Sequence, residues 1–503
     1  MGKKARKGYL AVDLGASSGR HVAGLFDGER LDLHEMYRFI NGPVAVGAHL
    51  HWDLLGQWSH ILTGMRAARE QAKEQHLGHF GSIGVDTWGV DFGLLGRGDV
   101  LLGNPYHYRD QRTRGMLDRA LEIVLREEIF AQTGLQFMEI NSLYQLLAMK
   151  LNNSPLLEVA QSLLMMPDLF HWLLTGEKAN EMTDVSTSQL FNPQTGDWSH
   201  ALIEKFGLPA HIFGPIVAPG TMLGPLLPGV AAETGLRDVQ VVLPGTHDTA
   251  SAVLAVPAAG VASEKPNWCY ISSGTWSLMG VELAKPVINE TCSRLNFTNE
   301  GGVGGTTRLL KNIAGLWLVQ ECRRIWRQDG RDYSWDYLAR IAGESKPLAS
   351  IINPDDPRLV APERMPGLIV ELCAESDQPR PETNGGVIRC ALESLALKYR
   401  QVLGNLEELI GGRIDAIHIV GGGAQNELLC QMAADACNRT VIAGPIEATA
   451  IGNLMLQAVS AGDVGSIAEA RQIIRASFAV EQYTPQNPGP WDEAYEKFLS
   501  LQR

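Results

Sequence analysis

The sequence predicts an α/β protein built from two similarly constructed halves. Residues 9–26 have the pattern of a buried strand, a Gly/Ser turn and a returning strand, and residues 267–283 repeat it. Other strand-like runs alternate with amphipathic helical segments, which is typical of α/β folds. We therefore expect an N-terminal domain over residues 1–247 and a C-terminal domain over residues 248–503.

In the first half, strands and helices alternate along the chain. The expected strands are residues 9–13, 21–26, 31–39, 83–86, 90–95 and 239–243. Residues 65–75 and 116–134 are expected helices, the second ended by Gly134 in the left-handed conformation. Residues 210–245 are rich in Pro and Gly, as connecting segments are.

The second half repeats the alternation. Strands are expected at residues 267–272, 276–283 and 414–420, and a strongly amphipathic helix at residues 312–326. The last of these strands ends in Gly421-Gly422-Gly423 and leads into a further helix.

Composition excludes several classes of protein. Of the 503 residues, 45% are hydrophobic and 20% charged, which is ordinary for a globular protein and excludes bulk disorder. The net charge of −13 argues against a protein that coats nucleic acid, and we expect small-molecule substrates, with no nucleic-acid or membrane partner. The sequence does not indicate an oligomeric state.

No run approaches the ~18 apolar residues of a membrane span. The basic start MGKKARK resembles a signal peptide, but Asp13 interrupts the apolar run after it, so we expect a cytoplasmic protein. The seven cysteines are odd in number and contain no C-x-x-C, so free thiols are expected. Cys373 and Cys390 could meet across a turn, and whether they are ever bridged is left open.

The first turn contains a literal G-x-S-x-G over residues 15–19. A nucleophile elbow needs a helix after the turn, whereas a strand is expected here, so a serine hydrolase is disfavoured. A wide Gly/Ser loop exposes backbone N–H groups that suit a phosphate. Asp13, just before the loop, either lies beside a Mg²⁺ ion or merely caps the turn.

Two segments of the second half suit the same ligand. The Ser273-Gly274-Thr275 turn has the chemistry of the first loop, and together the two could hold a polyphosphate. Gly421 to Gly423 would let a flat ligand or a phosphate approach the backbone, or would simply make a tight strand–helix connection. Neither a Walker A sequence nor G-x-G-x-x-G is present.

Two further segments carry polar side chains suited to a sugar hydroxyl. Asp248 is either a helix N-cap or a base that takes a proton from a hydroxyl. The run from Asp86 to Asp91 combines carboxylates with Trp88, a mixture that binds sugars, although a buried Trp with capped neighbours would look the same. Residues 105–113 and 166–168 could add polar groups. No metal-ligand spacing occurs among the 13 histidines, so no transition-metal site is expected.

Taken together and in this order, these segments resemble the FGGY family of carbohydrate kinases from about residue 8 to about residue 485. The segments that carry the resemblance are VDLGASSGR (12–20), GVDTWGVDFGLL (84–95), LMMPDLFHWLLTG (164–176), HDTASAV (247–253), SSGTWSLMG (272–280), TNEGG (298–302), LKNIAGLWLVQ (310–320), IVGGGAQN (419–426) and AGPIEATAIGN (443–453). The resemblance implies two RNase H-like domains of the actin-like ATPase type with a cleft between them, and transfer of the γ-phosphoryl group of ATP to a sugar.

The resemblance also implies roles for individual residues. Asp248 matches the catalytic base, and Asp13 matches the acid near Mg²⁺. The nucleotide positions that match are Ala16, Ser17, Ser18, Gly19, Arg20, Thr275, Asn312, Gln320 and Gly422. The sugar positions that match are Gly89, His247, Asp248 and Thr249.

Within the family, the runs DLGASSGR and DTWGVDF favour the branch that phosphorylates the 1-hydroxyl of L-rhamnulose. Kinases of L-fuculose or xylulose, and a non-catalytic sensor of sugar or nucleotide, remain alternatives. His51 stands before Trp52-Asp53 where a small polar residue is expected, and Leu169 stands where an aromatic residue is usual. Both departures bear on sugar preference and not on the kinase reaction.

Overall fold

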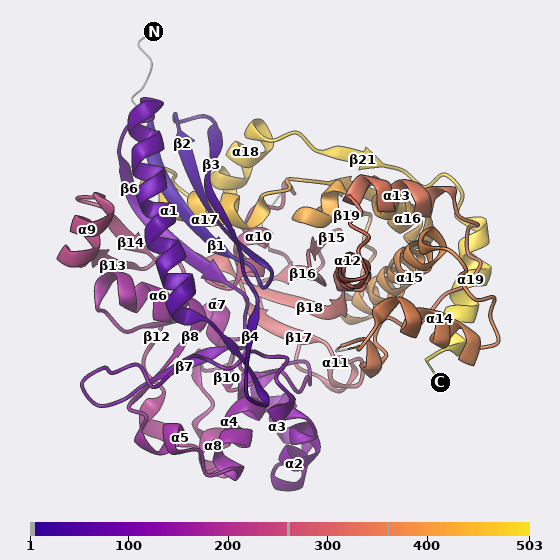
Figure 1. The fold of residues 1–503 in the computed structure, drawn as a ribbon, viewed down its shortest axis with the longest axis horizontal. Coiled ribbons are helices and arrows are strands. Elements are labelled where there is room, and N and C mark those ends of the chain that lie inside the picture. The colour runs from indigo at the N-terminus through magenta and orange to yellow at the C-terminus, as the bar shows by residue number, and fades with distance from the viewer. Residues whose placement is uncertain (1–5, 259–261, 361, 503) are drawn as a thin grey trace. The chain divides into compact units, whose positions relative to one another are not determined.

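A six-stranded sheet carries the first Gly/Ser turn in the computed structural model, which describes residues 6–258, 262–360 and 362–502 (Figure 1). In spatial order its strands are β13 (Met222–Pro225), β14 (Gln240–Val242), β6 (Phe80–Thr87), β1 (Lys7–Leu14), β2 (Ser18–Phe26) and β3 (Leu31–Ile40). Strands β1 to β3 are antiparallel, whereas β6 lies parallel to β1 and β14 parallel to β6. This register places Asp13 opposite Arg20 on one side and opposite Asp86 on the other.

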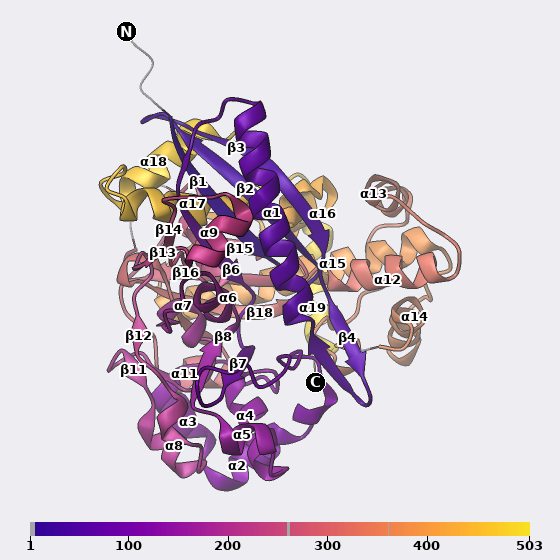
Figure 2. The same ribbon diagram turned by 60° about the vertical axis from the view of Figure 1, so that its left-hand side comes forward.

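Helices cover both faces of this sheet. An added Cβ on Gly64 of α1 (Leu54–Glu74) would lie 2.2 Å from the His21 ring of β2, so helix and strand are in close contact there. A Cβ on Gly24 of the same strand would lie 2.9 Å from Leu454 of α17 (Ala448–Ser460). Because side chains alternate along a strand, positions 21 and 24 face opposite sides, and the two helices therefore cover opposite faces. Figure 2 shows α1 lying along β2 and β3.

A seven-stranded sheet repeats this plan later in the chain. Its order is β17 (Thr298–Gly301), β18 (Thr307–Ala314), β16 (Trp276–Leu283), β15 (Trp268–Ser273), β19 (Ala416–Val420), β20 (Thr440–Ala443) and β21 (Glu481–Tyr483). Strand β15 pairs antiparallel with β16 and parallel with β19, just as β1 pairs with β2 and β6. The predicted repetition of strand, Gly/Ser turn and returning strand is confirmed.

The chain divides into two compact units. Unit 1 comprises Met1–Ala262, Glu282–Leu309 and Ala448–Phe478, and unit 2 comprises Ser263–Val281, Leu310–Glu447 and Ala479–Arg503. In unit 2, the 27-residue helix α15 (Asn384–Ile410) buries most of its length against neighbouring helices. Those neighbours are α12 (Trp317–Gln328), α13 (Trp335–Glu344), α14 (Met365–Glu375), α16 (Glu427–Cys437) and α19 (Gly489–Ser500). Among the described residues, no helix combines the length and apolarity needed to cross a membrane.

The remaining elements connect these layers. The paired short strands are β4 (Pro43–Val46) with β5 (His49–Trp52), β7 (Phe92–Leu95) with β8 (Ser162–Met165), β9 (Asn180–Glu181) with β12 (Ile216–Val217), and β10 (Phe191–Asn192) with β11 (Asp197–Trp198). The remaining helices are α2 (Met116–Ile123), α3 (Arg126–Thr133), α4 (Ser142–Leu151), α5 (Pro155–Val159), α6 (Met166–Thr175), α7 (Met182–Val185), α8 (His200–Lys205), α9 (Pro228–Thr234), α10 (Asp248–Leu254), α11 (Glu290–Arg294) and α18 (Ile467–Ser477).

The prediction of one helix over residues 116–134 is wrong. The chain is extended at Val124 (φ −133°, ψ 133°), which ends α2 and starts a second helix, α3. Glu127 and Glu128 lie in the first turn of α3, where carboxylates interact favourably with the helix N-terminus. Gly134 does end α3 with φ 62°, as predicted, and its N–H donates to the Phe130 carbonyl.

The predicted helix over residues 312–326 begins too early. Residues 307–314 form strand β18, and the helix α12 starts at Trp317. Between them an added Cβ on Gly315 would lie 2.4 Å from the Trp276 carbonyl carbon, so the chain is held against β16 there. Pairing in the sheet therefore overrides the helical pattern of the first residues. The predicted strand over residues 90–95 also begins later, at Phe92, because Val90 has φ 69°.

Candidate active site

The first Gly/Ser turn is a tight hairpin between β1 and β2. Gly15 N–H donates to the Ser18 carbonyl at 2.9 Å, and Asn41 ties the turn down by donating its amide to the Ser17 carbonyl and its Nδ2 to the Gly15 carbonyl. Within residues 6–258, 262–360 and 362–502, the Ala16 and Ser17 amides make no backbone hydrogen bond. Because a strand and not a helix follows the turn, it is no nucleophile elbow.

Asp13, at the end of β1, is paired with a cation. Its Oδ2 accepts from Arg20 Nε at 3.0 Å and from Arg20 Nη2 at 2.6 Å. Beside it, Asp86 is fully buried and accepts at Oδ2 from Asn453 Nδ2 at 2.6 Å, whereas its Oδ1 has no hydrogen-bond partner. Burial, followed by the nearby Asp13 carboxylate, raises the pKa of Asp86 well above its usual range. Two carboxylates and one guanidinium therefore meet beside the turn.

Residues 243–247 connect strand β14 to helix α10, and Glu181 anchors this connection. Thr246 donates to Glu181 Oε2 from its amide at 3.1 Å and from its hydroxyl at 2.6 Å. The Thr87 amide donates to the Thr246 carbonyl at 2.9 Å, and the His247 amide donates to Thr183 Oγ1 at 3.2 Å. These contacts fix the backbone that presents Asp248.

Asp248 is the first helical residue of α10, and His247 occupies the N-cap, so the N-cap interpretation of Asp248 is wrong. Its side chain is 31% exposed, and its Oδ1 accepts from Thr249 Oγ1 at 3.1 Å. Burial raises the pKa of this carboxyl most and Asp13 raises it further, while His247 acts in the opposite direction. The result is an accessible carboxylate with one of its two oxygens already engaged.

The DTWGVD segment (residues 86–91) leads from β6 towards β7. Asp91 is completely buried and accepts from three side chains, Trp52 Nε1 at 2.6 Å, Trp88 Nε1 at 2.9 Å and Gln145 Nε2 at 2.8 Å. Burial raises the pKa of Asp91 to about 6, and its donors oppose that shift. Trp52 is 0% exposed and Trp88 6% exposed, so the carboxylate organises an indole cluster that is largely internal.

Gly89 is held between this cluster and Thr187. An added Cβ on Gly89 would lie 2.8 Å from Thr187 Cγ2, and the next amide, Val90 N–H, donates to Thr187 Oγ1 at 2.8 Å. Val90 has φ 69°, a conformation that strains a β-branched residue. The glycine is therefore required by the packing of this turn, whatever ligand it faces.

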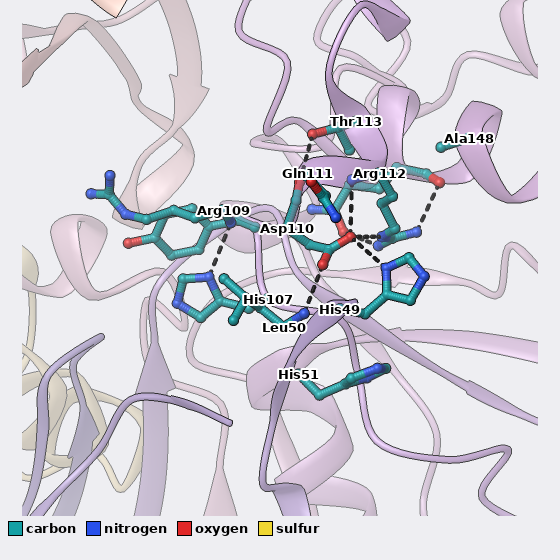
Figure 3. Close-up of polar contacts among 12 residues, drawn as sticks. His49, Leu50, His51, His107, Arg109, Asp110, Gln111, Arg112, Thr113 and Ala148 are labelled. Atoms are coloured by element: carbon teal, nitrogen blue, oxygen red, sulfur yellow. Dashed lines mark hydrogen bonds and ion pairs between the residues drawn. The ribbon is translucent and has the colours of Figure 1, made fainter. Parts of the chain in front are cut away.

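A second carboxylate, Asp110, joins the segments around His49, Leu50 and Arg112 (Figure 3). Asp110 accepts from the Leu50 amide at 2.7 Å and the Arg112 amide at 3.0 Å, and its Oδ1 lies 3.1 Å from His49 Nδ1. The Arg112 guanidinium donates to the Gln145 carbonyl and to Gln145 Oε1. Segment 105–113 thus joins the Asp91 cluster as predicted. Segment 166–168 also contacts this cluster, because the Met166 amide donates to the Asp91 carbonyl at 3.0 Å, whereas the Asp168 side chain is buried and accepts from the Glu181 amide.

In unit 2, the Ser273–Thr275 turn rests on the start of α12. The Leu316 amide donates to the Gly274 carbonyl at 3.1 Å, and the Trp317 amide donates to the Thr275 carbonyl at 3.0 Å. Gln320 lies one turn into the same helix, and Asn312 lies on β18 just before it. The three predicted nucleotide residues Thr275, Asn312 and Gln320 therefore come from neighbouring segments.

The three glycines after β19 lie against the same turn. Gly421 has φ 84°, and an added Cβ on Gly423 would lie 2.0 Å from Ser273 Oγ, so both positions require glycine for structural reasons. Gly422 differs, because it is exposed and a Cβ there would meet nothing within 4 Å. The fold leaves open space at Gly422, which is the predicted nucleotide position.

Several residues that hold the candidate site were missed from the sequence. Asn41 ties down the first turn, Glu181 anchors α10, and Asn453 orients Asp86. Asn453 lies in segment 443–453, which carries the family resemblance, but the sequence indicates no role for its side chain. None of these side chains is close in sequence to the group it holds, and no local sequence pattern indicates their roles.

Models of the FGGY family of carbohydrate kinases match this chain twice: the N-terminal domain over residues 8–255 and the C-terminal domain over residues 269–461. The rhamnulokinase of Bacteroides thetaiotaomicron is 44% identical, and the alignment covers 99% of this chain and all of that protein. The rhamnulokinase of Bacillus subtilis is 38% identical over 95% of this chain and 96% of its own length.

Solved structures share the fold. A gluconate kinase from Lactobacillus acidophilus superposes with a TM-score of 0.81 at 15% identity, covering 99% of this chain and 98% of that one. A glycerol kinase from Plasmodium falciparum with ADP gives a TM-score of 0.75 at 14% identity, covering 100% and 98%. The predicted two-domain α/β fold of the actin-like ATPase type is confirmed. With both family models matched and full-length relatives at 38–44% identity, the chain belongs to the FGGY family of carbohydrate kinases.

Proposed function

We propose that this carbohydrate kinase transfers the γ-phosphoryl group of ATP to the 1-hydroxyl of L-rhamnulose, giving L-rhamnulose 1-phosphate. The observation that carries the proposal is the 38–44% identity to proteins named rhamnulokinase along 94–99% of the chain. The seven cysteines are all buried thiols, including Cys373 and Cys390 with sulfurs 3.7 Å apart, which suits a reducing compartment. We therefore propose that the reaction takes place in the cytoplasm.

Asp248 is the proposed general base. Phosphoryl transfer to a hydroxyl requires that the attacking oxygen lose its proton as the new O–P bond forms. Asp248 offers a partly exposed carboxylate on a rigidly anchored helix start, as such a base requires. We assign Gly89, His247 and Thr249 to the sugar site with it, Thr249 acting through its hydrogen bond to Asp248.

The donor set around Asp13 suits Mg²⁺. This ion is usually bound by one or two carboxylates together with substrate phosphates and water. Asp13 lies next to Asp86, whose buried Oδ1 has no hydrogen-bond partner, and no group of three or more potential ligands that could bind a metal alone occurs in the described parts of the chain. We propose that Asp13 holds Mg²⁺ together with the nucleotide; when bound, the ion neutralises charge on the phosphates.

The proposed nucleotide residues fall on both units. In unit 1, the Ala16 and Ser17 amides, with Ser18, Gly19 and Arg20 of the same hairpin, would bind phosphate. In unit 2, the turn at Thr275 would do the same, and Asn312, Gln320 and Gly422 would contact the nucleotide. Among these residues Ser17 and Gly422 are exposed, Gly19 is buried, and the others are partly buried.

Replacing Gly422 by Ala is expected to raise the KM for ATP roughly tenfold, about 1.4 kcal/mol of binding, and to leave stability unchanged. The added methyl group meets no protein atom, so it costs nothing in the free protein, but it would occupy space that a bound nucleotide needs. Steady-state kinetics and thermal unfolding measure the two quantities. The matched control is Gly404→Ala, an exposed glycine of α15 that is equally open. An unchanged KM for ATP would remove Gly422 from the nucleotide site.

The substrate assignment is tested with a panel of ketoses. With ATP in excess, L-rhamnulose is expected to give kcat/KM at least about tenfold above L-fuculose and D-xylulose, since a buried polar group left without its hydroxyl partner costs about 1–3 kcal/mol. Phosphorus NMR of the product should place the phosphate on the 1-hydroxyl. A preference for another ketose would overturn the substrate, and turnover of none would overturn the proposed function.

A further inference from the structure

The imidazole of His247 lies between a buried arginine and the proposed base. Its Nδ1 is 3.1 Å from Arg308 Nη2, and its Nε2 is 3.5 Å from Asp248 Oδ1. Both flanking residues belong to unit 1, as does His247. The ring thus links a residue of β18 to the first residue of α10.

Arg308 is a charged residue that lies in the interior of unit 1. Its side chain is 0% exposed, and Arg308 Nε donates to the Gly301 carbonyl at 2.8 Å. Glu300 Oε2 lies 3.3 Å from Arg308 Nη2 and compensates the charge. A buried guanidinium with a carboxylate partner and a fixed backbone contact has little freedom to turn away from His247.

The arginine determines where the imidazole carries its proton. A guanidinium can only donate hydrogen bonds, so the ring nitrogen that it contacts must accept. Glu300 Oε2 is also 3.3 Å from His247 Nδ1, but the hydrogen bond to Nδ1 comes from Arg308. In the neutral ring Nδ1 is therefore the acceptor, and the proton is on Nε2, facing Asp248.

We propose that Arg308 is a positioning residue of the phosphoryl transfer, which holds His247 as the Nε2–H tautomer and so leaves Asp248 Oδ2 to take the proton of the substrate hydroxyl. Oδ1 already accepts from Thr249 Oγ1 at 3.1 Å, and the Nε2–H of His247 faces the same oxygen. The 3.5 Å separation is too long for a hydrogen bond in the free protein, and such contacts tighten when substrate binds. This inference rests on the proposed function only for the role of Asp248.

The tautomer is measured directly by ¹⁵N NMR of the full chain labelled at histidine. The His247 signals are assigned as those that disappear in His247→Gln. We expect a protonated Nε2 and an unprotonated Nδ1 in the free enzyme. A proton on Nδ1 would overturn the inference, whether or not Asp248 proves to be the base. Conversely, normal turnover by Asp248→Asn would overturn the proposed base and leave the tautomer result standing.

Activity separates positioning from a merely structural role. Arg308→Met removes the donor and is expected to lower kcat roughly tenfold or more, with KM for ATP unchanged and the Nε2–H tautomer lost, whereas Arg308→Lys keeps a donor and should recover most of kcat. Equal losses in both variants with the tautomer retained would overturn the proposal. If Arg308→Met does not fold, Glu300→Gln serves instead: the tautomer should persist, since Arg308 still donates, and a proton found on Nδ1 in this variant would overturn the proposal.

Discussion

Asp248→Asn is expected to lower kcat by about 10²–10⁴-fold, the usual contribution of a general base, while the enzyme still binds sugar and nucleotide. Asparagine has nearly the same shape and can still accept from Thr249 Oγ1 at its carbonyl oxygen, so the start of α10 should keep its structure. It cannot take up a proton at neutral pH. Steady-state kinetics gives kcat, and calorimetric titration with the ketose gives the affinity that should persist.

The pH dependence provides a second measurement of the same residue. A base must be ionised to act, so activity is lost as pH falls through its pKa. Burial, and then the Asp13 carboxylate, raise that pKa despite the opposing effect of His247, so the acidic limb of kcat should lie above the ordinary aspartate range near ~4. The residual activity of Asp248→Asn should lack this limb.

A matched control for this variant is Asp118→Asn. Asp118 is likewise in the first turn of a helix, α2, but its side chain is exposed. Its replacement should change kcat less than twofold and cost only a few tenths of a kcal/mol in stability. Near-normal kcat in Asp248→Asn, or a similar loss in Asp118→Asn, would contradict the assignment of the base.

The parts of the fold that could be predicted are those determined by a pattern of contiguous residues. Residues 9–26 contain an apolar run, a Gly/Ser turn and a second apolar run, so the β1–β2 hairpin follows from local pattern alone. The same pattern at residues 267–283 predicted the second hairpin and hence the two related halves. Gly134 as the end of a helix is equally local, since only a left-handed residue makes that cap.

Errors arose where tertiary contacts override local preference. Residues 312–314 fit the helical period of an amphipathic run, but in the structure they form the C-terminal end of strand β18. Val124 is apolar and fits a continuous helix, yet the chain is extended there and splits the helix in two. Periodicity cannot report such breaks because it records only which positions are buried.

The candidate site shows the same division. Asp13 and the glycine turns lie at the ends of strands and Asp248 at the start of a helix, and each lies in a sequence motif that indicates it. Their supports, Asn453 and Arg308, are distant in sequence, and only the fold brings them to Asp86 and His247. A side chain that acts through a long-range contact produces no periodicity or spacing in the sequence. The supporting residues of the site therefore could not be predicted.

Asp13→Asn is expected to lower kcat/KM for ATP by roughly 10²-fold and to raise the Mg²⁺ concentration needed for half-maximal rate. Lewis-acid stabilisation of a phosphoryl group is worth several kcal/mol, and about 1.4 kcal/mol corresponds to a factor of ten in rate. Asparagine keeps one neutral oxygen and so weakens the site without deleting it. Initial rates at varied ATP give kcat/KM, and a titration of initial rate against Mg²⁺ at fixed ATP gives the Mg²⁺ requirement.

The substitution also weakens the contact between residue 13 and Arg20. Replacing Arg20 itself separates this effect from the effect on Mg²⁺. Asp13 Oδ2 accepts from Arg20 Nε and Nη2, so Asp13→Asn turns a charge-assisted pair beside the proposed phosphate loop into a weaker contact. If the pair mattered only for folding, Arg20→Gln would lower the unfolding temperature as much as Asp13→Asn and leave the Mg²⁺ requirement of both unchanged.

An exposed ion pair of the same sheet supplies the control for charge alone. Asp32 pairs with Arg6 at 3.1 Å with both side chains about half exposed, and such pairs contribute little. Asp32→Asn removes one negative charge from unit 1 and should leave the Mg²⁺ titration where it was. A shift confined to Asp13→Asn therefore identifies a carboxylate that acts on the ion, whereas a normal titration in that variant would mean that Asp13 serves only to hold Arg20 against the turn.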